Sequence, residues 1–409
     1  MLTPADINLD RIMQRLDTLA RIGRADSGGY YRYTFSEPHI AATKLSAQWM
    51  TDAGLMPHYD RWGNLYGRTP GMDDTPCMMS GSHLDSVPNG GNFDGPLGVL
   101  TALEAAQTIL ERGLDLKRPL EVVSFIEEEG ARFLGLLGSQ LATGQIKHDP
   151  ESLKGYDGTP FMQALRDADL PEPSVGDVTQ RVASYVELHI EQGKRLEQAG
   201  IPIGVVTAIA GPAFMTIHLH GRADHAGATA YEDRHDTLLA AAEIIMAVRE
   251  LGTTRFAGRA HMTVGKIAAH PNVTNVIAGR TTFNIDCRAA DAETQAEIGS
   301  VLDDLLDQVT SRHGLTWERK TGHQVAATPI PGHLQAAIRT GAEAAGLQSK
   351  DLVSWAAHDA MVMAEVCDAG MLFVPCLDGR SHTPEEFVAS EDIAAGVATL
   401  ANTLLALAR

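Results

Sequence analysis

The sequence has no apolar run that approaches the roughly 20 residues of a membrane-spanning helix. Its opening stretch, MLTPADINLDRIMQRLDTLARIG, alternates charged and apolar residues at helical spacing. It never forms the apolar core of about 7 or more residues that marks a secretory signal. We therefore expect a protein that stays out of membranes and works in the cytoplasm.

Cysteine and positive charge are also scarce. Cys77, Cys287, Cys367 and Cys376 are scattered without paired spacing, which excludes a disulfide-stapled scaffold and fits a reducing compartment. The chain has 33 basic and 52 acidic residues, so its formal charge is -19. This excess repels phosphate backbones and anionic membrane surfaces, so neither nucleic acid nor membrane is an expected partner.

Core material is plentiful. The chain has 409 residues, 44% of them hydrophobic, which predicts a catalytic domain and at least one further domain. Short apolar runs alternate with helical patterns, as in a sheet covered by helices, and we predict an α/β fold with a mixed sheet. The expected strands are 76–80, 120–126, 183–190 and 371–375, and the expected helices run to Ile22, from about 39 to 53 and from 97 to 110.

The middle of the chain follows a different order. Strands at 214–219, 261–267, 281–287 and 315–320 and helices at 235–251 and 292–313 predict a β-α-β-β-α-β, ferredoxin-like α+β domain. Gly211-Pro212 and the Pro-rich stretch 328–332 mark its borders. The predicted division is therefore 1–211 and 329–409 for the catalytic domain, with 212–328 inserted.

Four acid- and imidazole-bearing segments each close an apolar run: GSHLDSVPNGGNFDG (81–95), FIEEEGARF (125–133), YVELHIEQG (185–193) and DGRSHTPEE (378–386). Ligands of open α/β sheets gather beyond the carboxyl ends of the strands, where these segments are expected. Together they offer a mixed nitrogen and oxygen set that suits two zinc-like ions. The candidate ligands are His83, Asp94, Glu129, His189 and His382.

Neighbouring residues have supporting roles. Asp85 lies two positions after His83 on an extended segment, so its carboxylate can hold that imidazole. The run Glu127 to Glu129 could be a solvated acidic face, but a bound cation would relieve its repulsion, and a turn at Gly130 would let Glu128 and Glu129 both reach the site. A metal-assisted hydrolase needs a carboxylate that moves a proton from the attacking water to the leaving nitrogen. The residues alone leave open which glutamate does so.

These segments, with DHAGAT, HPNVTNVIAGRTTFNIDCR and HDA, make the chain resemble the M20 metallopeptidase superfamily over nearly its whole length. The match is to the branch of N-carbamoyl-L-amino acid hydrolases and allantoate amidohydrolases. The resemblance implies a di-metal catalytic domain, an inserted dimerisation or lid domain and a homodimer. It implies that the five candidate ligands hold two divalent ions, with zinc, manganese and cobalt to consider, and that Asp94 bridges them.

The resemblance also assigns the remaining roles. Glu128 falls on the general base, and His225 falls on a histidine that reaches a neighbouring subunit's site and steadies the oxyanion. Asn275 and Arg288 fall on residues that hold the substrate carboxylate. Gln192 and, more weakly, His358 are further substrate contacts.

The expected reaction is hydrolysis of an N-carbamoyl-L-amino acid, a small carboxylate, to carbon dioxide, ammonia and the amino acid. Hydrolysis of allantoate or another ureido acid is the close alternative, and an aminoacylase, a dipeptidase or an inactive metal-binding scaffold fits less well. The chain departs from the glycine-rich allantoate pattern at Trp355 and Ala357, and Arg380 stands where a small or apolar residue is more usual.

Overall fold

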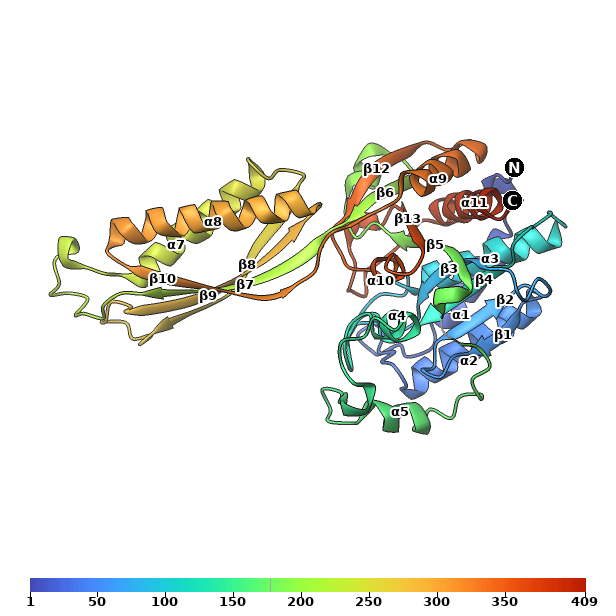
Figure 1. The fold of residues 1–409 in the computed structure, drawn as a ribbon, viewed down its shortest axis with the longest axis horizontal. Coiled ribbons are helices and arrows are strands. Elements are labelled where there is room, and N and C mark those ends of the chain that lie inside the picture. Colours follow the sequence, from blue (N-terminus) through green and yellow to red (C-terminus); the bar gives the residue numbers. More distant parts are fainter. Residues whose placement is uncertain (177) are drawn as a thin grey trace. The chain divides into compact units, whose positions relative to one another are not determined.

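The computed structural model describes residues 1–176 and 178–409, which form two compact units (Figure 1). The first unit comprises Met1–Thr207, Ile330–Leu352 and His358–Arg409, and the second comprises Ala208–Pro329 and Val353–Ala357. The borders at 208 and 329 lie beside the predicted ones. The short segment 353–357, which the prediction left in the catalytic domain, packs with the second unit. In the described residues no helix combines the length and hydrophobicity needed to cross a membrane.

A mixed sheet forms the centre of the first unit, in the order β1-β2-β4-β3-β5-β13-β6, and β12 also pairs with β6. β4, β3, β5 and β13 run parallel, and the outer strands β2 and β6 pair antiparallel. This confirms the predicted mixed α/β fold. The strands are β1 (Met56–Tyr59), β2 (Leu65–Arg68), β3 (Cys77–His83), β4 (Leu120–Phe125), β5 (Val182–Ile190), β6 (Ile203–Ile209), β12 (Ser349–Ser354) and β13 (Asp368–Val374).

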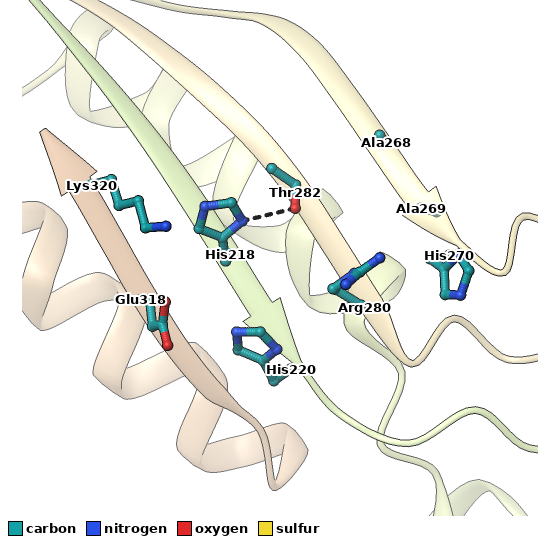
Figure 2. A pocket seen from close by; sticks show the side chains of 9 residues that line it. All are labelled: His218, His220, Ala268, Ala269, His270, Arg280, Thr282, Glu318 and Lys320. Atoms are coloured by element: carbon teal, nitrogen blue, oxygen red, sulfur yellow. Dashed lines mark hydrogen bonds between the residues drawn. The ribbon is translucent and has the colours of Figure 1, made fainter. Parts of the chain in front are cut away.

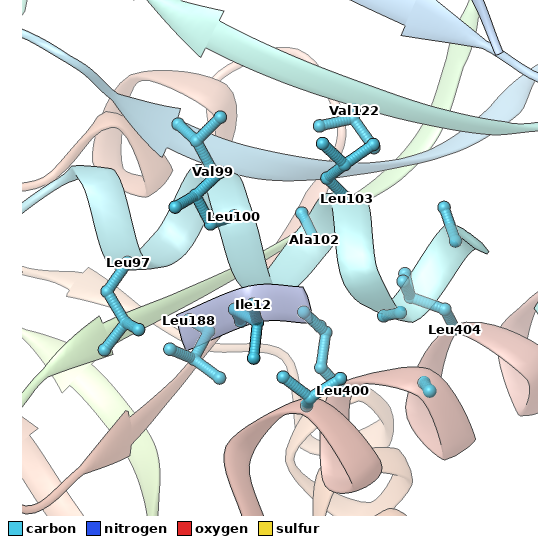
Figure 3. Packing of buried hydrophobic residues seen from close by; sticks show 14 of the residues in the cluster. Ile12, Leu97, Val99, Leu100, Ala102, Leu103, Val122, Leu188, Leu400 and Leu404 are labelled. Carbon is cyan, nitrogen blue, oxygen red and sulfur yellow. The ribbon is translucent and has the colours of Figure 1, made fainter. Parts of the chain in front are cut away.

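Helices cover this sheet and bury its apolar side chains. Strands β3 and β4 are buried along their whole length, as expected when both faces of a parallel sheet are covered. Ile12, Leu100, Leu188 and Leu400 from four different elements meet in the largest core (Figure 3). The helices are α1 (Leu9–Leu19), α2 (Glu37–Asp52), α3 (Pro96–Glu111), α4 (Leu137–Thr143), α5 (Phe161–Asp167), α6 (Arg195–Ala199), α9 (Gly332–Ala344), α10 (Asp359–Met363) and α11 (Ser390–Leu407).

The second unit has the predicted β-α-β-β-α-β order. Its antiparallel sheet runs β10-β7-β9-β8, and the short β11 (Thr328–Pro329) pairs with the end of β6. Asp236 and Asp291 cap the two helices by accepting hydrogen bonds from backbone N–H groups. The elements are β7 (Gly211–His220), α7 (Thr237–Thr253), β8 (Ala260–His270), β9 (Arg280–Ala289), α8 (Ala292–His313) and β10 (Thr316–Gln324).

One face of this small sheet packs on the helices and the other is open. Residues along β9 alternate between buried and more exposed, so that Phe283, Ile285 and Cys287 enter the core beneath the helices. The alternate residues, including Arg280 and Arg288, lie on the open face.

Candidate metal centre

Segments far apart in the sequence end at one edge of the large sheet. Because β4, β3, β5 and β13 are parallel neighbours, their carboxyl ends meet there. His83 is the last residue of β3, and His189 lies one residue before the end of β5. Glu128 and Glu129 follow β4, and His382 follows β13. The structure therefore brings the predicted ligands to the same place.

Asp94 lies between two sets of donor atoms. Its Oδ1 is 3.1 Å from His189 Nε2 and 3.6 Å from His83 Nε2. Its Oδ2 is 3.5 Å from His382 Nε2, and Glu129 Oε2 is 3.5 Å from the same nitrogen. Within each set, the donor atoms all lie within 4.8 Å of one another. One carboxylate thus presents one oxygen to each set, which is the arrangement that joins two cations.

Two buried imidazoles, those of His83 and His189, are oriented so that each Nε2 can bind a cation. His83 Nδ1 lies 3.2 Å from the Asp85 carbonyl oxygen, and His189 Nδ1 lies 3.0 Å from the Ile190 carbonyl oxygen. A carbonyl oxygen only accepts, so each Nδ1 carries the proton and each Nε2 offers a lone pair. His83 Nε2 is buried and has no hydrogen-bond partner among the described residues. This nitrogen, aimed at two carboxylates, fits a cation.

The crowded carboxylates have shifted pKa values. Burial raises the pKa of Glu129 to about 7, and it raises the pKa of Glu128 well above the ordinary glutamate value. Burial acts in the same direction on Asp94, but His189, His382 and His83 outweigh it and hold the pKa of this carboxyl well below its usual range. The site thus keeps Asp94 ionised and makes Glu128 and Glu129 good acceptors of a proton or a cation.

Asp85 supports the site in two ways. Its Oδ1 lies 3.5 Å from His83 Nδ1, as the sequence predicts for a carboxylate that holds this ring. The same carboxylate also accepts hydrogen bonds from the backbone N–H groups of Glu128, at 3.2 Å, and Glu129, at 3.1 Å. Asp85 therefore fixes the turn that brings both glutamates into the site.

Sequence reasoning missed Glu386 and Ser381. Glu386 is buried, and its Oε1 accepts hydrogen bonds from the backbone N–H groups of Phe93, at 2.7 Å, and Asp94, at 2.9 Å. The Ser381 hydroxyl lies 2.5 Å from Asp94 Oδ2 and 3.1 Å from Glu386 Oε2. These residues set the position of the shared carboxylate. Their only signal in the sequence was their place in DGRSHTPEE, beside a predicted ligand.

Gln192 and His358 both lie beside the centre. The Gln192 side-chain amide donates to Asp94 Oδ2 at 2.7 Å, and its backbone has a φ of 53°. His358 is buried, with its ring centroid 4.6 Å from that of His189. Glu187, which sequence reasoning also missed, forms a further cluster of possible ligands with these two histidines. Its signal was its position two residues before His189, on the same face of β5.

His225, Asn275 and Arg288 belong to the second unit, and only the first two are neighbours. The backbone N–H of Ala226 donates to the Asn275 carbonyl oxygen, and His225 forms an isolated bridge with Val276. His225 Nδ1 accepts from the N–H groups of Gly227 and Ala228, so its Nε2 carries the proton and can donate. Asn275 precedes β9, whereas Arg288 is its penultimate residue. Extended backbone separates Arg280 from Arg288 by about 26 Å.

The three departures from the family pattern have different surroundings. The Trp355 ring stacks on His261 with centroids 4.1 Å apart, and its carbonyl oxygen accepts from Arg288 Nη1 at 2.7 Å. Ala357 is exposed. Arg380 forms an exposed ion pair with Glu385 at 3.2 Å.

Comparisons with known proteins extend over nearly the whole chain. Residues 79–406 match the model of peptidase family M20/M25/M40. The chain is 36% identical over 405 residues to the N-carbamoyl-L-amino acid amidohydrolase of Geobacillus stearothermophilus, covering 98% of each protein. It is 33% identical over 427 residues to allantoate deiminase 1 of Glycine max, covering 96% of this chain and 88% of that protein. A solved hydantoinase/carbamoylase family amidase from Burkholderia ambifaria is 32% identical, covers 98% of both chains and superposes with a TM-score of 0.92.

Proposed function

This chain belongs to peptidase family M20/M25/M40, and from that premise we propose that it hydrolyses N-carbamoyl-L-amino acids to carbon dioxide, ammonia and the free amino acid. Family membership and the carbamoylase-named relatives support a metal-dependent amidohydrolase. The observation that carries the proposal is the Asp94 carboxylate, which faces one donor set with each oxygen.

The donor sets fit two divalent cations of the zinc, manganese or cobalt type. His83 and His189 would hold one and Glu129 and His382 the other, with Asp94 shared between them. When bound, such cations polarise the carbamoyl carbonyl group and make a water molecule acidic near neutral pH.

Glu128 is the proposed general base. Its Oε2 lies 3.6 Å from His83 Nε2, so it borders the donor set. Burial raises its pKa, which favours proton uptake from the attacking water. The same carboxyl then returns the proton to the leaving nitrogen, and Asp85 holds the backbone of this turn in place.

The second unit is proposed to bind the substrate. Arg288 suits bidentate recognition of a carboxylate, Asn275 adds an amide donor, and His225 presents an Nε2–H to the developing oxyanion. Because β9 separates Arg288 from the paired His225 and Asn275 segments, one small substrate can meet all three only if two copies of the chain contribute. We therefore expect a homodimer with shared sites.

Allantoate hydrolysis is the second candidate, favoured by the similarity to a protein named allantoate deiminase. A panel of N-carbamoyl-L-amino acids against allantoate separates the two. Activity confined to allantoate would overturn the carbamoyl proposal.

Exchanging Glu128 for Gln tests the proposed base. Glu128 belongs to neither of the two sets that share Asp94, although its carboxylate also forms a possible set with His83 and Glu129. E128Q should keep bound metal, because all five proposed ligands remain, and should lose about 100-fold to 10,000-fold in kcat. H382A is the matched comparison and should lose metal. Metal analysis beside a carbamoylase assay checks both, and normal turnover of E128Q would remove Glu128 from this role.

A further inference from the structure

The open face of the small sheet carries a hollow of about 480 Å³ in the second unit (Figure 2). His220 on β7, Arg280 on β9 and His270 on β8 are direct cross-strand neighbours, so their side chains lie abreast on one face. His218 occupies the next row and contacts the Thr282 hydroxyl at 3.0 Å. The hollow is lined by His218, His220, Ala268, Ala269, His270, Arg280, Thr282, Glu318 and Lys320.

This hollow brings together two cationic side chains, Arg280 and Lys320. In the described part of the chain, neither Arg280 nor Lys320 forms an ion pair with a carboxylate, whereas Arg312 and Arg319 on the helix-covered side do. Glu318 is the one acidic residue in the lining. In a chain of formal charge -19, such a group stands out as a site for an anion.

The arrangement does not suit a metal ion. The histidines are spread over two strands with an arginine between them in the row, and a guanidinium beside the ligands would repel a cation. Among the described residues, the clusters whose donor atoms lie close enough to hold an ion all come from the first unit.

We propose that this hollow binds a small organic phosphate, with one phosphate group over Arg280 between His220 and His270 and a second anionic group at Lys320. A tetrahedral phosphate accepts hydrogen bonds in several directions, which matches donors arriving from three strands, and the guanidinium fork can bind two of its oxygens. Lys320 lies two strand spacings across the sheet from Arg280, about 10 Å, and four residues further along the strands, about 13 Å. The second anionic group therefore belongs at the far end of the ligand, within the hollow that both side chains line. Ala268 and Ala269 leave room for an uncharged body.

Calorimetric titration of the metal-loaded full chain with fructose 1,6-bisphosphate tests the proposal. Free fructose and the dicarboxylate adipate are the comparison ligands. The bisphosphate should bind, R280Q should weaken its binding at least tenfold, and K320Q should weaken it several-fold. R312Q, which removes the same charge from the helix-covered side of the same unit, should leave the affinity unchanged.

Each other outcome overturns the proposal. A bisphosphate drawn to the metal centre would bind R280Q as tightly as the original protein. Equal weakening in R312Q would show a response to net charge alone, and tighter binding of adipate would rule out the phosphate. Unchanged chemical shifts of His220 and His270 on addition of the bisphosphate would likewise show that the ligand binds elsewhere.

Discussion

Gly95 lies against the ring of His83, one of the proposed ligands. A Cβ atom built at this position would come within 2.3 to 2.6 Å of three ring atoms, and the backbone has a φ of 81°. Only a glycine combines this conformation with so close an approach. Gly95 therefore does more than permit a turn, because its missing side chain leaves space for the His83 imidazole beside Asp94.

Replacing Gly95 with Ala should displace the His83 ring and lower metal affinity by roughly 10-fold to 100-fold, the scale seen when a ligand loses its orientation. G113A is the matched control, since Gly113 also has a positive φ of 58° but an added Cβ would meet nothing within 4 Å. G113A should lower the free energy of unfolding by about 1 kcal/mol and leave the metal affinity unchanged. Competition with a chromophoric chelator measures both affinities, and equal values would contradict the contact argument.

At the level of elements, α3 approaches the sheet through Gly98. A Cβ there would lie 2.5 Å from the Leu188 carbonyl oxygen of β5 and 2.7 Å from the Ser82 Cβ of β3. The helix can therefore pack its backbone on both central strands, and it delivers the loop that carries Asp94.

Exchanging Gly98 for Ala should push α3 away from the sheet. The free energy of unfolding should fall by about 1 to 3 kcal/mol, which is usual for an overpacked core. The control is G299A in the interior of α8, where the nearest atom to an added Cβ is Arg319 Nη1 at 3.8 Å. That change should stabilise the protein by up to about 1 kcal/mol through helix propensity. Urea unfolding of both variants measures the difference, and a neutral G98A would refute the close-packing account.

Helices and strands could be predicted from the sequence where apolar residues recur on one face or where capping residues mark both ends. The helix expected at 292–313 has those bounds, because apolar residues recur at helical spacing and Asp291 and Gly314 close its two ends. The C-terminal helix α11 was not assigned. Every residue from Ile393 to Leu405 is buried, so no polar face reveals a helical period in this stretch. β12 was missed because it is short and mostly polar, and its pairing with the distant β6 defines it.

The site residues, too, could be predicted where the signal is local and were missed where it is not. The proposed ligands could be predicted because four segments that carry histidines and carboxylates each close an apolar run, and the carboxyl ends of parallel strands meet at one edge. Glu386 could not, since it acts on the backbone N–H groups of Phe93 and Asp94, nearly 300 positions earlier. The residues around Glu386 in the sequence give no sign of this contact, because only the tertiary fold brings the two segments together.

On the scale of the whole molecule, the site makes stability depend on pH and metal. Burial raises the pKa of Asp359 to about 8, and a hydrogen bond with Asp94 raises that of His382 to about 9. Both groups bind their proton more tightly in the folded state, so the free energy of unfolding falls as pH rises through these values. His39 and His358, whose pKa values burial lowers, act in the opposite direction but only below about pH 6.5, where unfolded histidine is protonated.

The thermal midpoint of the metal-stripped protein should therefore fall between pH 6.5 and pH 9. D359N should show a shallower fall, because the substitution removes one of the protons involved. Saturating metal should flatten the curve, since a cation replaces the proton at His382. Scanning calorimetry at several pH values measures all three, and a midpoint in the metal-stripped protein that stays constant over this range would be evidence against the linkage.

The positions of the proposed substrate-binding residues at opposite ends of β9 predict how two copies of the chain share a site. His225 and Asn275 lie beyond one end of the strand and Arg288 lies at the other. In the proposed shared site, one copy's first unit combines with another copy's His225 loop. H225A and E128Q should each be nearly inactive alone. In a heterodimer purified through two different tags, one site receives an intact Glu128 from the H225A copy and an intact His225 from the E128Q copy, while the other site lacks both. The heterodimer should therefore recover about half of the original kcat, whereas use of His225 within its own chain would leave both sites dead.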